Sequence, residues 1–108
     1  MPTPHHPSAG VRKALGKLGS DLRDARRRRR LPMAVLADRA FTSRATLQRV
    51  EAGDPAVSMG IYAAVMNSLG LLDGLSQLAD ASMDSVGQAL ANELLPQRVR
   101  LKKAKEEP

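Results

Sequence analysis

The segment of residues 31–53 constrains the fold more than any other part of this chain. Its sequence, LPMAVLADRAFTSRATLQRVEAG, predicts two short helices, over residues 33–40 and 43–51. Pro32 suits the first position of the first helix, and the Thr-Ser pair before the second can cap it. Because only a tight turn separates them, the two helices are expected to pack against each other.

The apolar positions of the two helices predict which sides meet. The residues expected to point inward are Leu36, Ala37, Leu47 and Val50. A small residue such as Ala37 lets two helices approach closely, whereas a larger side chain would push them apart. With these positions buried, the second helix exposes small or hydrogen-bonding residues: Ser43, Arg44, Ala45, Gln48 and Arg49.

This exposed set suits a helix that enters the major groove of DNA. An arginine can bond guanine O6 and N7 as a fork, a glutamine can bond adenine N6 and N7, and an alanine methyl can touch a thymine methyl. We therefore expect Arg44, Ala45, Gln48 and Arg49 to face base edges. A packed helical bundle with surface arginines is the plainer alternative.

Apolar residues also recur at helical spacing on both sides of this segment. Residues 1–10 are rich in Pro, His and Ser and are expected to be a disordered tail. A long helix is expected from Val11, and Pro32 ends it. Its inward face comprises Val11, Leu15, Leu18, Leu22 and Ala25, and a basic run, Arg26 to Arg30, follows.

Three further helices are expected after Gly53. Ser58 caps the first, over residues 59–69, and Gly70 closes it. The second covers residues 71–79, with Leu72, Leu75 and Leu78 inward. The third begins near Asp84 and stops at Pro96, and a charged tail, residues 98–108, follows. No stretch alternates like a strand, so the sequence predicts an all-α protein with a domain over residues 11–79 and a C-terminal helix within 80–97.

The charge balance favours a polyanionic partner. Lys and Arg number 17 against 11 Asp and Glu, giving a formal net charge of +6. Cationic surface attracts phosphate and steers encounter with it. Charge that merely keeps the protein in solution explains the total equally well, and the position of the charge beside the paired helices tips the balance toward DNA.

Several classes of protein are not expected. Cysteine is absent, and no apolar run reaches the ~18 residues needed to span a membrane. The N-terminus has no apolar signal-peptide core, so we expect a cytoplasmic protein. The only histidines, His5 and His6, lie in the expected tail, which leaves no metal site, cofactor or converging catalytic groups to predict.

Residues 18–71 resemble the Cro/cI-type helix-turn-helix regulators, also called the XRE family. The matching residues are Leu22, Arg26, Leu36-Ala37, Ser43 to Leu47, Val50 to Gly53, Ser58, Ile61 and Leu69-Gly70. The resemblance implies a five-helix, lambda-repressor-like domain whose second and third helices form the DNA-binding motif. The additional C-terminal helix would lie outside that domain.

The resemblance also implies roles for individual residues. Arg44, Ala45, Gln48 and Arg49 match groove-facing positions. Phosphate-side positions are matched by Ser43, Thr46 and Ser58. One or two of Arg27, Arg29 and Arg30 in the basic run are also expected near phosphate. Arg26 and Glu51 match an ion pair that clamps the first helix to the third. The rest of the basic run could equally be a solvated face.

Three positions depart from the family pattern. The turn position that usually holds glycine is Phe41, so either Phe41 adopts a left-handed backbone conformation at a cost or the turn differs slightly. Thr42 replaces a branched aliphatic residue, and Met33 replaces a common phosphate-binding glutamine.

The C-terminal part has a second, shorter resemblance. Residues 84–90 and 94–100 resemble the tail of HipB-like regulators, which repress their own operon and bind a HipA-type kinase toxin. An ordinary sixth helix at the core or at a dimer interface explains the same residues equally well. The expected dimer or partner contacts are Leu72, Leu75, Met83, Leu90 and Leu94.

Three functions therefore stay open. The first is a homodimeric repressor that binds an inverted repeat with centres roughly 34 Å apart and serves as the antitoxin of a HipA-like toxin. The second is a protein-interaction module that neutralises a kinase. The third is a phage-type or metabolic regulator without a toxin partner.

Overall fold

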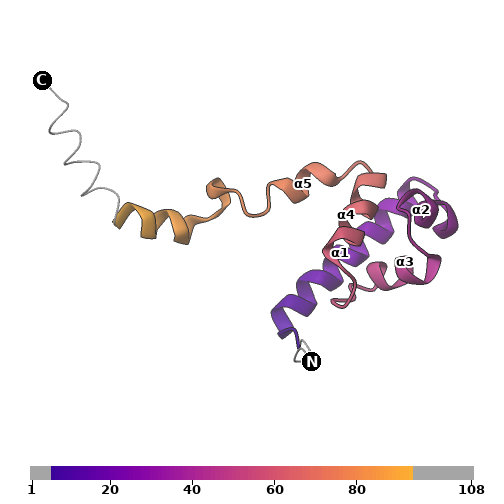
Figure 1. Cartoon of the computed structure of the whole chain (residues 1–108), viewed down its shortest axis with the longest axis horizontal. Coiled ribbons are helices and arrows are strands. Elements are labelled where there is room, and N and C mark those ends of the chain that lie inside the picture. The colour runs from indigo at the N-terminus through magenta and orange to yellow at the C-terminus, as the bar shows by residue number, and fades with distance from the viewer. Residues whose placement is uncertain (1–5, 94–108) are drawn as a thin grey trace, which may run out of the picture. The chain divides into compact units, whose positions relative to one another are not determined.

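The computed structural model describes residues 6–93, and these residues form helices and no strand. The all-α prediction is confirmed. The elements are α1 (Ala9–Arg28), α2 (Met33–Arg39), α3 (Arg44–Glu51), α4 (Met59–Ser68), α5 (Leu72–Ser76) and a short 3-10 helix, η1 (Ala81–Met83). Residues 85–93 are also helical. The chain divides into two units between Asp73 and Gly74, and α1 to α4 pack together in the first (Figure 1).

Helix α1 begins two residues before its predicted start. The Ser8 hydroxyl accepts a hydrogen bond from the Val11 amide at 3.3 Å and so caps the helix. Ala9 and Gly10 are therefore helical, and the boundary predicted after residue 10 is wrong. Leu22 and Ala25 are buried as expected, but Val11 is 45% exposed, because the N-terminal part of α1 extends beyond the core.

The core of the first unit forms where α2, α3 and α4 meet α1. All four residues predicted to point inward are buried: Leu36, Leu47 and Val50 are 0% exposed and Ala37 is 3% exposed. Tyr62, Val65, Met66 and Leu69 of the α4 region complete this core. Burying these apolar side chains stabilises the contact between α2 and α3.

Four helices end in the same way. A left-handed residue follows the last turn, and its amide and the next amide donate hydrogen bonds back to carbonyls of that turn. The left-handed residues are Arg30, Phe41, Gly53 and Gly70, with φ values of 53°, 55°, 74° and 75°. After α2, the Phe41 amide donates to the Asp38 carbonyl at 3.1 Å and the Thr42 amide donates to the Ala37 carbonyl at 2.9 Å. Of the two alternatives expected at Phe41, the left-handed backbone is the one that the structure shows.

The start of α2 and the region of α5 differ from the predictions. Pro32 is the N-cap residue and not the first helical residue. Helix α5 is only five residues long and buries no side chain. Leu72 is 38% exposed and Leu78 is 68% exposed, so the inward orientation predicted for them is wrong. The first unit ends at Asp73, whereas the predicted domain extends to residue 79. None of residues 74–80 is buried.

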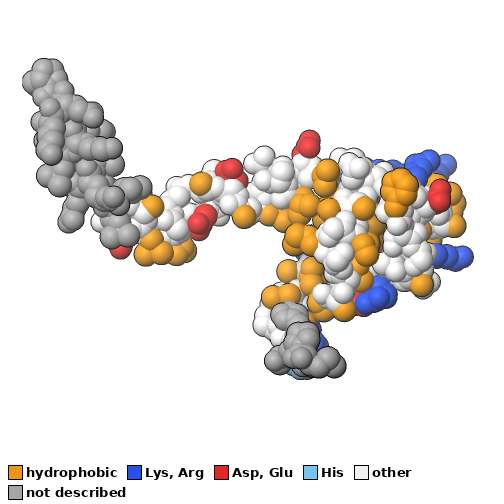
Figure 2. Space-filling view, in the orientation of Figure 1, with side chains coloured by type: hydrophobic (Ala, Val, Ile, Leu, Met, Phe, Trp, Pro, Cys, Tyr) orange, Lys and Arg blue, Asp and Glu red, His pale blue; other side chains and the backbone are white. Residues whose placement is uncertain are grey.

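The second unit, as far as it is described, consists of η1 and the helix of residues 85–93. The Asp84 carboxylate accepts a hydrogen bond from the Gly87 amide at 2.9 Å and caps this helix. The second unit also carries exposed apolar residues. Leu78, Met83, Val86 and Leu90 are between 56% and 70% exposed. Hydrophobic side chains gather along one side of residues 85–93 in Figure 2. Leu94 and the predicted charged tail, residues 98–108, lie outside the described residues.

Candidate nucleic-acid interface

Helix α3 begins at a cap that orders its first turn. The Ser43 hydroxyl accepts a hydrogen bond from the Thr46 amide at 3.0 Å and donates one to the Thr46 hydroxyl at 2.9 Å. This arrangement leaves the Thr46 hydroxyl proton free to donate to another acceptor. Both hydroxyls thus lie at the start of α3, where amide dipoles favour an anion.

The outward side of α3 carries the residues that the sequence assigned to base reading. Arg44, Ala45, Gln48 and Arg49 are all exposed, while Leu47 and Val50 on the opposite side are 0% exposed. At 100° per residue, the four exposed residues span about 140° of the helix circumference. Helix α3 therefore presents a continuous polar strip whose backbone is fixed by the packed side.

Arg26 and Glu51 join α1 to α3 through a two-pronged ion pair. Arg26 Nε lies 2.7 Å from Glu51 Oε2, and Arg26 Nη2 lies 3.1 Å from Glu51 Oε1. Arg26 Nη1 also donates to the Leu31 carbonyl at 3.0 Å. The two side chains are 11% and 6% exposed, so the pair is shielded from water and forms the clamp that the resemblance implied.

Two glycines allow α1 to approach the end of α3 more closely than the sequence analysis anticipated. A Cβ at Gly19 would lie 2.5 Å from the Val50 carbonyl oxygen, and a Cβ at Gly53 would lie 2.5 Å from the Leu15 carbonyl oxygen. Such distances admit no side chain, so backbone packs on backbone at this crossing. In the sequence, Gly53 was named only among the residues that match the family pattern, and Gly19 was not singled out.

Asp54 organises the loop between α3 and α4. Its Oδ2 accepts a hydrogen bond from Arg49 Nε at 2.8 Å, and its Oδ1 accepts one from the Ala56 amide at 2.8 Å. The Arg49 guanidinium and then the Ala56 amide hold the pKa of the Asp54 carboxyl below its usual value. The Tyr62 hydroxyl donates to the Asp54 carbonyl at 2.8 Å, and burial raises the pKa of Tyr62.

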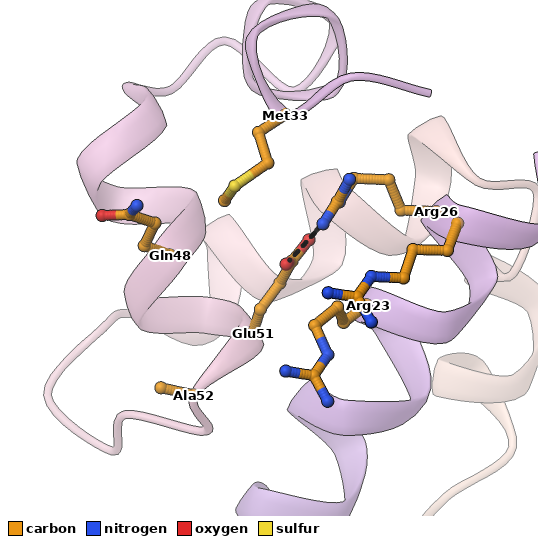
Figure 3. A pocket seen from close by; sticks show the side chains of 7 residues that line it. Arg23, Arg26, Met33, Gln48, Glu51 and Ala52 are labelled. Atoms are coloured by element: carbon orange, nitrogen blue, oxygen red, sulfur yellow. Dashed lines mark hydrogen bonds and ion pairs between the residues drawn. The ribbon is translucent and has the colours of Figure 1, made fainter. Parts of the chain in front are cut away.

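A hollow of about 250 Å³ lies between α1 and α3, beside the exposed strip. Its cationic lining residues are Arg23, Arg26 and Arg27, and Gln48 and Glu51 line the α3 side (Figure 3). The dashed lines in Figure 3 join Arg26 to Glu51, and none reaches Arg23. Among the described residues, Arg23 and Arg27 form no hydrogen bond or ion pair, so two uncompensated cations stand next to Gln48.

The residues assigned to phosphate from the sequence lie in different environments. The Arg29 side chain donates to the Ala25 carbonyl at 2.9 Å and so supplies a hydrogen bond to a carbonyl near the C-terminal end of α1. Arg30 is exposed in the left-handed turn after α1. The Ser58 hydroxyl accepts from the Ile61 amide at 3.3 Å and caps α4. Arg27, one of the arginines expected near phosphate, lies beside Gln48. Arg23 was missed, because helical spacing alone did not indicate that α1 faces α3 there.

Positive charge gathers on the first unit. Figure 2 shows Lys and Arg side chains around α2 and α3, with few acidic side chains between them on the visible face.

No helix in the described part of the chain is long and apolar enough to cross a membrane. Residues 6–93 contain no group of three His, Cys, Asp or Glu side chains able to hold a metal ion.

Two short helices joined by a tight turn, with the second exposing a polar strip, define a helix-turn-helix DNA-binding protein. Comparison with known families agrees, because residues 17–79 match a protein-family model described as "Helix-turn-helix domain". The chain therefore belongs to the helix-turn-helix domain family and is a DNA-binding regulator. No curated protein and no solved structure matches the chain closely enough to count as similar.

Proposed function

We propose that this chain is a sequence-specific transcriptional repressor that reads double-stranded DNA through the major groove. The observation that carries this proposal is the outward strip of α3. Arg44, Ala45 and Gln48 are exposed, while Leu47 and Val50 on the opposite side of the helix are 0% exposed. Arg44 is suited to a guanine and Gln48 to an adenine, and Ala45 is suited to a thymine methyl. No rearrangement of α3 is needed before it enters the groove.

Phosphate contacts on both sides of the groove would hold α3 in register. Thr46 at the start of α3 and Ser58 at the start of α4 are candidates, together with exposed Arg30. Arg23 and Arg27 are stronger candidates than Arg29, because they are uncompensated beside Gln48, whereas Arg29 already bonds the end of its own helix. The interface therefore combines base-reading groups on α3 with cations on α1.

We further propose that the repressor is a homodimer that binds an inverted-repeat operator in the cytoplasm. One short helix reads only a few base pairs, so two linked half-sites greatly raise affinity. Met83 and Leu90 in the second unit are strongly exposed apolar residues, and the loss of their contact with water would favour association. Two further candidates for the dimer contact are less exposed: Leu72 of the first unit is 38% exposed, and Leu75 of the second unit is half-buried.

The second unit also suits a protein partner, and the HipB-like resemblance favours a HipA-like kinase toxin. The chain would then be an autoregulatory antitoxin without enzymatic activity of its own. Val86 and Leu90 lie one helical turn apart in residues 85–93 and are 70% and 56% exposed, as expected of an amphipathic helix that docks on another protein. A regulator without a toxin, or a kinase-neutralising module that does not depend on DNA, are the competing functions.

Selection of bound sequences from a random DNA pool tests the repressor proposal. We expect the wild type to select an inverted repeat. Arg44→Ala should lose the preference for one base pair of each half-site, at a cost in binding free energy on the order of 1–3 kcal/mol. Arg12→Ala removes the same charge from the exposed N-terminal half of α1 and serves as the matched control. A wild-type chain that retains all sequences equally would contradict sequence-specific binding.

The dimer and partner proposals have separate tests. Light scattering of wild type and Leu90→Asp measures association, and we expect the substitution to yield monomers, since Leu90 is not part of any buried core. A pull-down with a kinase encoded beside the gene tests the antitoxin role. The Arg44→Ala, Arg49→Ala double variant should keep the kinase while losing DNA, and loss of both would contradict a separate partner surface.

A further inference from the structure

The ion pair between Arg49 and Asp54 lies at one edge of the strip on α3. Arg49 Nε lies 2.8 Å from Asp54 Oδ2, and the two side chains are 50% and 29% exposed. The pair thus forms in contact with solvent, next to the residues that face DNA. A side chain left free at this place would instead sample many rotamers.

Asp54 is itself held from two other directions. Its second carboxylate oxygen accepts the Ala56 amide at 2.8 Å, and its carbonyl accepts the Tyr62 hydroxyl at 2.8 Å. Tyr62 is 4% exposed and belongs to the core. The position of the Asp54 carboxylate is therefore fixed by the folded domain, and the carboxylate in turn fixes the guanidinium of Arg49.

The contact with Asp54 uses only one of the five N–H groups of Arg49. Among the described residues, Nη1 and Nη2 of Arg49 form no hydrogen bond. These two nitrogens can still form a fork to the O6 and N7 atoms of a guanine. The ion pair thus restrains the side chain while leaving a recognition edge available.

We propose that Asp54 is a specificity-determining positioning residue that holds Arg49 ready to read a guanine. This inference rests on the proposed function as a sequence-specific DNA-binding protein. Asp54 acts in two ways. It orders Arg49 before binding, which reduces the entropy lost on binding. Its negative charge also repels phosphate and keeps Arg49 engaged, so that Arg49 does not become a backbone contact on every sequence.

Asp54→Asn tests this role, because asparagine keeps an acceptor for the Ala56 amide but loses the charge that holds Arg49. The measurement is the ratio of affinities for the selected operator and for operators changed at the base pair read by Arg49. In Arg49→Ala this ratio should fall by about fivefold or more, and in Asp54→Asn it should fall in the same direction. Affinity for unrelated DNA should stay unchanged or rise.

The matched control is Asp24→Asn, which removes the same charge from an exposed position on α1. It should leave the ratio unchanged while raising affinity for all DNA by a similar factor. Thermal unfolding checks that each variant folds. If Asp54→Asn does not fold, Asp54→Ser takes its place, since a serine hydroxyl can also accept an amide two residues on.

A double-variant cycle decides whether Asp54 acts through Arg49. In the Arg49→Ala background, Asp54→Asn should produce no further loss of discrimination. An equal loss of affinity for every sequence in both backgrounds would make Asp54 a purely structural residue and overturn the inference. If the wild type selects an operator and Arg44→Ala behaves as expected, such a result leaves the proposed function intact. A wild type without any sequence preference overturns both.

Discussion

Arg26 of α1 and Glu51 of α3 form a two-pronged ion pair across 25 residues of sequence, with oxygen–nitrogen distances of 2.7 and 3.1 Å. The third contact of Arg26, to the Leu31 carbonyl, ties the same guanidinium to the segment that leads into α2. One side chain therefore connects the helix that carries the flanking arginines, the entry to α2, and the helix that reads DNA.

Glu51→Ala should destabilise the fold strongly. Removing one partner of a buried pair leaves an uncompensated charge, which typically costs about 3–5 kcal/mol. Urea denaturation measures the loss as a lower midpoint with an unchanged slope. Asp21→Ala is the control, because its pair with Lys17 is 56% and 77% exposed and should contribute little. Equal midpoints for wild type and Glu51→Ala would show that the pair does not stabilise the domain.

Phe41→Gly should make the protein more stable. Phe41 has a φ of 55° and is 96% exposed, so the substitution relieves left-handed strain without losing packing. The expected gain is about 1 kcal/mol, visible as a higher melting temperature in a thermal scan. Phe41→Ala removes the same aromatic ring but keeps the strain, so it should bring no comparable gain. A lower melting temperature for Phe41→Gly would indicate that the ring makes a stabilising contact.

Two left-handed glycines should respond differently to alanine. At Gly70 an added Cβ meets no atom within 4 Å, so Gly70→Ala should cost only the left-handed strain, about 1–2 kcal/mol. At Gly53 the same Cβ would lie 2.5–2.6 Å from the backbone of Leu15 and Gly16. Gly53→Ala should therefore unfold at a clearly lower urea concentration than Gly70→Ala. Similar midpoints for the two variants would contradict the close crossing of α1 and α3.

Arg23 and Arg27 should contribute to affinity without contributing to sequence preference. If each neutralises one phosphate, each alanine substitution should reduce the slope of log affinity against log salt by about 1. The measurement is fluorescence anisotropy of labelled operator at several salt concentrations. Arg12→Ala should leave the slope unchanged. A change in base preference in Arg23→Ala would instead assign this residue to the groove.

The helices and their caps could be predicted from sequence because they depend on nearby residues. Ser43 and Ser58 cap the helices that follow them, and the apolar spacing placed Leu36 and Leu47 in the core. The inward orientation predicted for residues after α4 failed, because spacing does not show whether another element is present to cover an apolar side. Leu72 and Leu78 have helical spacing, yet they belong to different units, and Leu72 remains 38% and Leu78 68% exposed.

The candidate site shows the same division. The outward side of α3 follows from which residues of that one helix are apolar, so Arg44 and Gln48 could be assigned from sequence. The pairing of Arg49 with Asp54 could not, because it depends on how the loop after α3 folds back and is held by Tyr62. Arg27 was already one of the arginines expected near phosphate, whereas Arg23 becomes a candidate only when α1 is seen beside Gln48.

The sequence by itself thus determined the class of fold, the ends of most helices and the side of α3 that faces outward, since all of these arise from interactions within a few residues. Only the tertiary structure decided how closely α1 crosses α3 at Gly19 and Gly53, which arginines remain uncompensated, and which carboxylate restrains Arg49. Those properties depend on atoms that lie far apart along the chain and meet only when the domain is packed.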